Sequence, residues 1–440
     1  MPAKAGHALY GLRLDALALQ PADAGRASLL GMDAMGGHAG SFSSGIVRRL
    51  ASLGLAVAVT GCTTAELPRL PRPQADLIKE RQAYEARAEA FAREVARRGV
   101  ARIKASYDAY LAGLAPAPPV IDLLVLSGGG DWGAFGAGVL KGWGRVSGPM
   151  ARPEFDVVTG VSTGALIAPF AFLGDDRSID HIVRLYRNPR EDWFRPRGVL
   201  SFLTGGASYG DIPGLEKDIH EALDETMLRR LVEAGADGRL LAVNTSNLDF
   251  GEMRAWDLVA EARRALETGE ADRVHRILLA STAVPGAFPP REIDGGLYVD
   301  GALTGNILYG GFTRIEDHAV ALWTRLYPGT PMPKTRYWII FNNQFRPPPE
   351  VVQPNWSSVL PRSLDTSSRS ATVNAMRHLF ALAEVWRLAY DAEVELRYIS
   401  VPDDWVPPKP GLFDKEVMNA LADMGERMGA DPTSWRTDPP

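Results

Sequence analysis

The 440-residue chain contains a single cysteine, Cys62, so no disulfide bond and no cysteine-based metal site can form within it. Its seven histidines show neither the H-x-x-x-H nor the H-E-x-x-H spacing of helical metal sites. The formal net charge of −5 gives no reason to expect nucleic acid as a partner. These absences lead us to expect no metal, no cofactor and no nucleic-acid binding.

The apolar run at residues 50–59 is too short to cross a bilayer, which needs about 20 residues. It follows Arg48 and Arg49 and leads into V-T-G-C at residues 59–62, which is the layout of a secretory signal. V-T-G-C resembles the lipobox of bacterial lipoproteins, and this resemblance implies that Cys62 is lipidated and becomes the mature N-terminus. The alternative is a buried strand that carries a free cysteine.

Residues 1–61 are therefore expected to be a leader and signal segment, whose first 45 residues lack any sustained periodicity. The lipobox resemblance implies a bacterial cell envelope protein. Thr63 follows the cysteine where aspartate would signal inner-membrane retention, so we expect the outer membrane, facing the periplasm. Residues 62–75 are rich in proline and predict a tether. Residues 76–113 show a helical stripe of apolar side chains and predict a helical arm packed on the next domain.

Two glycine-containing turns organise residues 121–164. An apolar run ends in G-G-G at residues 128–130, and a second apolar run ends in G-V-S-T-G at residues 160–164. A helical pattern separates the two runs, so the stretch predicts a βαβ unit with special backbone at both strand ends. The second turn has the G-x-S-x-G form, in which a tight bend between strand and helix exposes the hydroxyl of Ser162. A plain turn would fit that motif equally well on its own.

The first turn favours nucleophilic catalysis. Three successive glycines allow backbone N–H groups to point outward together at a helix N-terminus, where negative charge is favoured. Such a turn suits a phosphate or the oxyanion of acyl transfer. Asp131 and Trp132 stand where a phosphate-binding loop would place lysine, so we interpret Gly128, Gly129 and Gly130 as an oxyanion hole.

These two turns, together with A-S-T-A-V-P-G-A-F-P-P at residues 280–290 and Y-V-D-G-A at residues 298–302, resemble the four blocks of the patatin-like phospholipase family, in family order. The resemblance covers roughly residues 120–345. It implies a three-layer α/β/α domain with a mostly parallel central sheet. It also implies a Ser-Asp dyad that hydrolyses acyl esters of a membrane phospholipid or lysophospholipid.

Two aspartates compete for the role of base to Ser162. Asp294 begins the literal string D-G-G, whereas Asp300 is followed by glycine and alanine. We choose Asp300 because it follows a run of strand-forming residues, and because Asn306 lies six residues on, as in the family's D-G-G-x-x-x-N pattern. Asp294 fits the corner of a hairpin better. Partial burial would raise the pKa of the chosen aspartate and make it a better base.

Departures from the family leave two alternatives open. Trp132 replaces a common arginine or lysine, and Ala302 replaces a glycine, which would fit an inactive envelope lipoprotein that serves as a scaffold. The G-x-S-x-G turn would also fit a Ser-His-Asp esterase of the α/β-hydrolase type, with His318 or His378 as base. Both histidines lie in patterns typical of surface or packing positions, so we favour the dyad.

The remaining pattern divides the chain into a catalytic domain at residues 118–345 and an extension at residues 346–440 that packs on it through a helix and a strand. We expect a hairpin at residues 240–258 and a helix at 270–281. Further strands are expected at 318–326, 336–342 and 394–401, and a helix at 366–392. The last thirty or so residues predict a peripheral helix with a loose end.

Overall fold

The computed structural model describes residues 69–197, 206–310, 317–409 and 411–440. The expected leader, the lipobox with Cys62 and the first half of the tether, residues 62–68, lie outside these residues. The elements below belong to one compact unit, Arg72–Pro440. Among the described helices, none is both long enough and apolar enough to cross a membrane.

The main helices and strands follow in chain order. They are α2 (Gln74–Leu111), β1 (Ile121–Leu126), α3 (Gly133–Trp143), β2 (Val157–Val161), α4 (Thr163–Leu173), α5 (Asp176–Arg187), β3 (Arg195–Pro196), β4 (Gly210–Asp211), α6 (Pro213–Ala222), α7 (Glu225–Ala234), β5 (Leu240–Asn247), β6 (Glu252–Asp257), α8 (Leu258–Thr268), α9 (Asp272–Ser281), β7 (Arg291–Ile293), β8 (Gly296–Asp300), α10 (Ala319–Leu326), β9 (Thr335–Phe341), α11 (Trp356–Tyr390), β10 (Val394–Ser400) and α12 (Lys415–Gly429).

The central sheet has the order β10-β9-β1-β2-β5-β8-β7, with β6 paired to β5 outside this path. Strands β10, β9, β1, β2 and β5 are parallel to one another, whereas β6 and β8 run antiparallel to β5. The hairpin expected at residues 240–258 is present as β5 and β6. A mostly parallel sheet must bury both faces, and helices cover both, as the sequence predicts for an α/β/α architecture.

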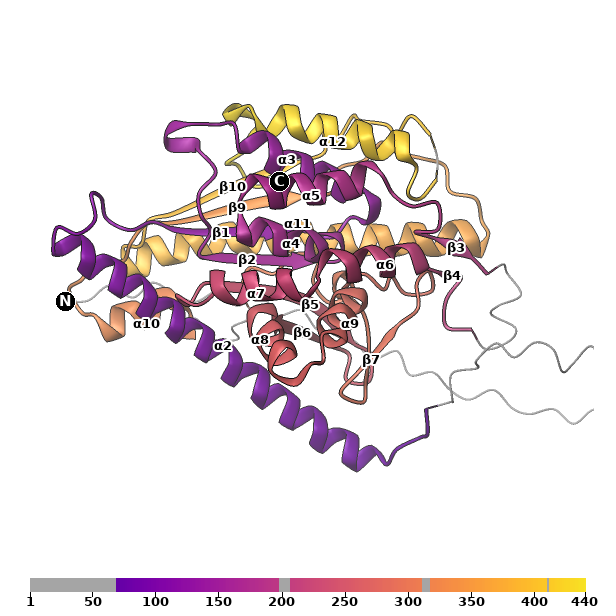
Figure 1. The fold of residues 1–440 in the computed structure, drawn as a ribbon, viewed down its shortest axis with the longest axis horizontal. Coiled ribbons are helices and arrows are strands. Elements are labelled where there is room, and N and C mark those ends of the chain that lie inside the picture. Colours follow the sequence, from indigo (N-terminus) through magenta and orange to yellow (C-terminus); the bar gives the residue numbers. More distant parts are fainter. Residues whose placement is uncertain (1–68, 198–205, 311–316, 410) are drawn as a thin grey trace, which may run out of the picture. The chain divides into compact units, whose positions relative to one another are not determined.

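Alternating side chains of the strands face two different helical layers. Leu124, Leu126 and Val158 pack with α3, α4 and α12 in the largest apolar cluster. Val125, on the opposite face of β1, packs with α11, and Ile121 packs with α2 and α10. The long helix α2, drawn in indigo in Figure 1, thus supplies part of the second layer.

The strand expected at residues 318–326 is wrong, because that segment is α10 (Ala319–Leu326). Its apolar residues Val320, Leu322 and Trp323 are buried, the last two against α2. A short apolar run fits a buried helix as well as a buried strand, and periodicity alone does not separate them.

The expected loose C-terminal end is also wrong. Helix α12 packs directly on α3, since a Cβ atom on Gly425 would lie 2.1 Å from the carbonyl oxygen of Phe135. Trp435 then packs against Trp143 in a tilted arrangement and against Trp338 edge-on, with ring centroids 4.6 and 5.1 Å away. The C-terminal segment therefore belongs to the core around the central sheet, although its proline and aspartate content predicts a peripheral position.

Candidate active site

Ser162 occupies the bend between β2 and α4. Its backbone has φ 52° and ψ −124°, a conformation that residues other than glycine rarely adopt. A Cβ atom on Gly160 would lie 2.4 Å from the carbonyl oxygen of Gly164, and one on Gly164 would lie 2.4 Å from that of Leu126. Both flanking glycines are thus required for the bend to pack against β1, as the G-x-S-x-G motif predicts.

Hydrogen bonds through the side chain of Ser281 fix the backbone of the bend. The N–H of Ser162 donates to Oγ of Ser281 at 3.0 Å, and that hydroxyl donates to the carbonyl oxygen of Asn244 at 2.7 Å. Ser281 is the last residue of α9 and belongs to the conspicuous block at residues 280–290. One function of this block is therefore to fix the strained residue in place.

Strand β5 brings Ser162 and Asp300 together. β6 occupies one edge of β5, so β2 and β8 must share the other. β2 runs parallel to β5 and ends where Val161 pairs with Asn244, whereas β8 runs antiparallel and ends where Asp300 pairs with Thr245. The two strands consequently meet head to head, with Ser162 directly after one strand end and Asp300 at the other.

Asp300 is buried, with 3 % of its surface exposed. Its carboxylate accepts a hydrogen bond from the N–H of Ala302 at 2.8 Å, and the side chain of Ser162 lies close enough to influence its pKa. Burial penalises the charged form and raises the pKa of Asp300 to about 6, although the neighbouring Ser162 hydroxyl and the Ala302 N–H both act to lower it. The site therefore holds a carboxylate that is ionised at neutral pH but considerably more basic than a free aspartate.

Ala302 leaves this arrangement intact. Its N–H makes the bond to Asp300, and alanine supplies that donor as well as glycine does. At the neighbouring Gly301, by contrast, a Cβ atom would lie 2.4 Å from the carbonyl oxygen of Asn244. Only the first glycine of the family's D-G-G string is thus sterically required here.

Asp294, the competing aspartate, lies elsewhere. It stands at the corner between β7 and β8 with φ 54°, and Arg273 donates to both its carboxylate oxygens, at 2.7 and 3.0 Å. The hydrogen bond from Arg273 lowers the pKa of Asp294. The structure therefore brings Asp300 to Ser162 and gives Asp294 an ion pair at a hairpin corner.

The glycine turn lies beside Ser162, but its three amides differ. The N–H of Gly128 donates to Oδ1 of Asn306 at 3.0 Å, so Gly128 does not fit the expected role of oxyanion donor. Within the described residues, the N–H groups of Gly129 and Gly130 have no acceptor. A Cβ atom on Gly128 would lie 3.0 Å from that of Ser162, so this glycine instead makes room for the serine.

Asn306 and Asn342 fix the turn from two sides. Asn306 accepts from Gly128 and donates through Nδ2 to Thr372 of α11 at 3.1 Å. Asn342 donates through Nδ2 to the carbonyl oxygen of Ser127 at 2.8 Å. The backbone of Asn342 also lies directly against Gly129, since a Cβ atom on this glycine would be 2.0 Å from the backbone carbonyl oxygen of Asn342. The family pattern points to Asn306, whereas nothing in the sequence singles out Asn342.

The C-terminal extension closes over the same turn. Asp131 is buried, and its carboxylate accepts from the N–H of Phe413 at 3.0 Å. Burial raises the pKa of Asp131 to about 6. Trp132 packs edge-on against Trp405, with ring centroids 4.9 Å apart. The two residues that depart from a phosphate-binding loop thus tie the turn to the extension, a role that sequence reasoning missed.

The two histidines considered as bases have other surroundings. His378 accepts or donates a hydrogen bond at 2.9 Å with the hydroxyl of Tyr309. His318 is half-buried and packs against Trp386 of α11, with ring centroids 5.3 Å apart. The group that the structure brings to the Ser162 hydroxyl is the carboxylate of Asp300.

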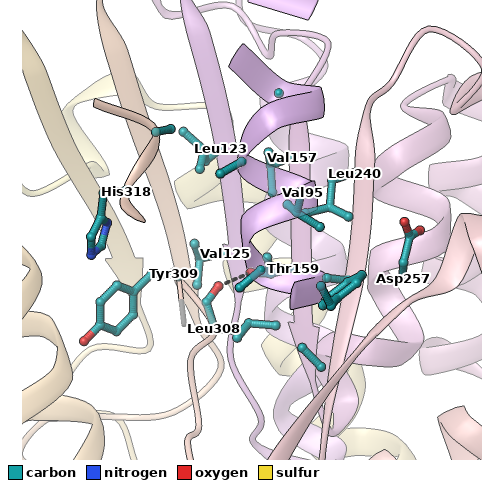
Figure 2. Close-up of a pocket in the computed structure, with 18 of the residues that line it drawn as sticks. Val95, Leu123, Val125, Val157, Thr159, Leu240, Asp257, Leu308, Tyr309 and His318 are labelled. Carbon is teal, nitrogen blue, oxygen red and sulfur yellow. Dashed lines mark hydrogen bonds between the residues drawn. The ribbon is translucent and has the colours of Figure 1, made fainter. Parts of the chain in front are cut away.

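A cavity of about 620 Å³ lies between α2 and the sheet, and Figure 2 shows its largely apolar lining. Val125, Val157 and Thr159 face it from β1 and β2, and Thr159 donates to the carbonyl oxygen of Leu308 at 2.5 Å. Neither Ser162 nor Asp300 is among its lining residues. The cavity is therefore distinct from the site around the serine.

The raised pKa of Asp300 predicts a pH-dependent difference in stability for Asp300→Asn. The pKa of Asp300 is about 6 in the folded state, whereas an ordinary aspartate, as in the unfolded chain, has a pKa of 3.8. The folded state therefore binds the proton more tightly, and the wild type loses stability as pH rises from about 4 through 6. Asparagine does not ionise, so the variant avoids this loss. We expect the stability of Asp300→Asn relative to wild type to be greater at pH 8 than at pH 4 by up to about 3 kcal/mol, measured by denaturant unfolding.

Asp294→Asn is the matched control, with the opposite sign. In the wild type the pKa of the Asp294 carboxyl is lowered by folding, so the stabilising effect of its charge exists at pH 8 and is lost as pH falls. This variant should therefore be destabilised more at pH 8 than at pH 4. If the relative stabilities of the two variants changed in the same direction between pH 4 and pH 8, the burial described for Asp300 would be contradicted.

The chain matches no curated protein. Among solved structures, the crystal structure of VipD from Legionella pneumophila aligns with a TM-score of 0.33 and 13% sequence identity, covering 73% of this chain and 68% of VipD. A family model described as patatin-like phospholipase matches residues 124–312, a range that includes both glycine turns, Ser162, Asp300 and Asn306. The resemblance seen in the sequence is thereby confirmed, and residues 124–312 belong to the patatin-like phospholipase family.

Proposed function

We propose that this protein hydrolyses fatty-acyl ester bonds of membrane lipids, as a phospholipase A or lysophospholipase, through a dyad of Ser162 and Asp300. Membership of the family supports lipid acyl hydrolase activity in general. The observation that carries the finer proposal is that β2 and β8 end side by side on β5, which places Ser162 next to a buried carboxylate with a raised pKa. A serine hydroxyl is a poor nucleophile without such a base.

The arrangement supports a two-step reaction. Asp300 accepts the hydroxyl proton of Ser162 as the serine oxygen attacks the ester carbonyl carbon. The amides of Gly129 and Gly130, which lack acceptors among the described residues, stabilise the negative oxygen of the tetrahedral intermediate. The intermediate collapses to an acyl-serine, and the alcohol leaves with the proton. Asp300 then activates a water molecule, which releases the fatty acid and restores Ser162.

We expect Ser162→Ala and Asp300→Asn each to reduce kcat for a short-chain ester by at least about 10³-fold, because the two groups act as a unit. The double variant should be scarcely worse than either single one. Asp294→Asn and His378→Ala should keep wild-type turnover and serve as matched controls. Steady-state kinetics on purified proteins checks this. Loss of activity in His378→Ala or His318→Ala, with Asp300→Asn active, would instead favour a Ser-His-Asp esterase.

We further propose that the protein is a lipoprotein of the bacterial cell envelope, anchored through Cys62 at the periplasmic face of the outer membrane. The basic pair, short apolar run and single cysteine at residues 48–62 support this proposal. One acyl chain anchors a protein only marginally, whereas two or more anchor it stably. A tethered catalytic domain meets its lipid substrate at a raised effective concentration.

Cys62→Ser should release the protein from the membrane fraction. It should also weaken turnover of bilayer phospholipid while sparing a soluble short-chain ester, since only the first substrate depends on tethering. Fractionation, the two assays and the N-terminal mass of the parent protein check this. A Cys62→Ser protein still held at the membrane, with an unmodified parent cysteine, would contradict the anchor but not the dyad.

A further inference from the structure

Three side chains with metal-binding atoms meet where α6 packs on α9. They are His220, near the end of α6, and Asp272 and His275, in the first turn of α9. One ligand atom of each lies within 4.8 Å of those of the other two. Nε2 of His220 and Oδ1 of Asp272 are 3.6 Å apart, and the two imidazole centroids are 4.1 Å apart.

Backbone carbonyls orient both imidazoles. Nδ1 of His220 lies 2.6 Å from the carbonyl oxygen of Glu216, and Nε2 of His275 lies 2.9 Å from that of Leu223. A carbonyl oxygen only accepts, so each of these nitrogens carries the proton of its neutral ring. The lone pairs therefore lie on Nε2 of His220, which is 3.6 Å from Oδ1 of Asp272, and on Nδ1 of His275. Histidine ligands of metals are fixed by this type of hydrogen bond.

His275 supplies an independent observation. The residue is 5 % exposed, and its Nδ1 atom is buried without a hydrogen-bond partner among the described residues. A buried polar atom left without a partner carries a free-energy cost, because it has lost its bonds to water and gained none in return. A cation bound between the three side chains would accept this lone pair and remove the cost.

We propose that His220, Asp272 and His275 bind one divalent transition-metal ion of the zinc class, with water in the fourth position. Two imidazole nitrogens and one carboxylate oxygen are a donor set that suits Zn²⁺. Metal–ligand distances near 2.0–2.2 Å place tetrahedral ligands about 3.4 Å apart. The 3.6 Å between Nε2 of His220 and Oδ1 of Asp272 is already close to this spacing. The other ligand atoms lie within 4.8 Å of one another, and the exposed side chains of His220 and Asp272 can rotate to shorten those distances.

The ion would link α6 to the helix that supports the serine. α9 begins at Asp272 and ends at Ser281, whose hydroxyl accepts the N–H of Ser162. The metal would be structural, because its two ligands on α9, Asp272 and His275, lie in the first turn of the helix and the contact with Ser162 is made from its last residue. Sequence reasoning missed the site because 52 positions separate His220 and Asp272, and a D-x-x-H pair alone is not a recognised metal motif.

The test uses the full chain purified without a histidine tag and stripped with chelator. Titration calorimetry with Zn²⁺ should show one ion per chain, and saturating Zn²⁺ should raise the Tm by mass action. His220→Ala and Asp272→Asn change exposed side chains, and each should weaken Zn²⁺ affinity by about 100-fold or more and abolish the Tm shift. His378→Ala removes an imidazole elsewhere and should bind as wild type.

Absence of stoichiometric Zn²⁺ binding by the wild type would overturn the proposal. So would full binding by both His220→Ala and Asp272→Asn, which would assign the ion to another group such as Cys62. Because calorimetry and Tm are read without substrate, neither result depends on the Ser-Asp dyad.

Discussion

The arrangement of the site depends on one edge of β5. Because β6 fills the other edge, β2 and β8 share this one and meet head to head at Asn244 and Thr245. This meeting point places a strained serine beside a carboxylate although 138 residues separate them in the sequence. The side chain of Asn244 reinforces it, donating to the carbonyl oxygens of Gly301 and Gly305 at 3.0 Å each.

The surroundings of Ser162 combine burial with fixed hydrogen bonds. Asp300 is deprived of water and becomes a stronger base, while the backbone of the glycine turn is held by Asn306 and Asn342. The amides of Gly129 and Gly130, which have no acceptor in the part of the chain that the structure describes, are thus available without reorganisation, the condition under which donors stabilise a developing oxyanion most effectively. Asp131 and Trp132 connect the turn to the C-terminal extension, so the extension is part of the scaffold of the site.

Much of this could be predicted where local chemistry is decisive. The G-x-S-x-G bend requires its glycines for steric reasons that depend only on nearby backbone, and the parallel sheet follows from alternating apolar runs and helices. The run of strand-forming residues before Asp300 distinguishes it from Asp294 in the sequence, and the geometry places Asp300 beside the serine.

Other features depend on contacts between distant segments, which no local pattern encodes. The bond that occupies the Gly128 amide comes from Asn306, 178 residues away, so the three glycines looked equivalent in the sequence. Trp435 enters the core through contacts with the rings of Trp143 and Trp338. Residues 319–326 form a helix whose buried side chains Leu322 and Trp323 pack against α2.

The most direct test of the account is covalent labelling of the purified protein with a fluorophosphonate, followed by peptide mass spectrometry. We expect one adduct, on Ser162, and a labelling rate that falls as pH decreases through about 6, where Asp300 takes up a proton. A folded protein that remains unlabelled at pH 8, or that carries its adduct on another residue, would contradict the proposed role of Ser162 and Asp300.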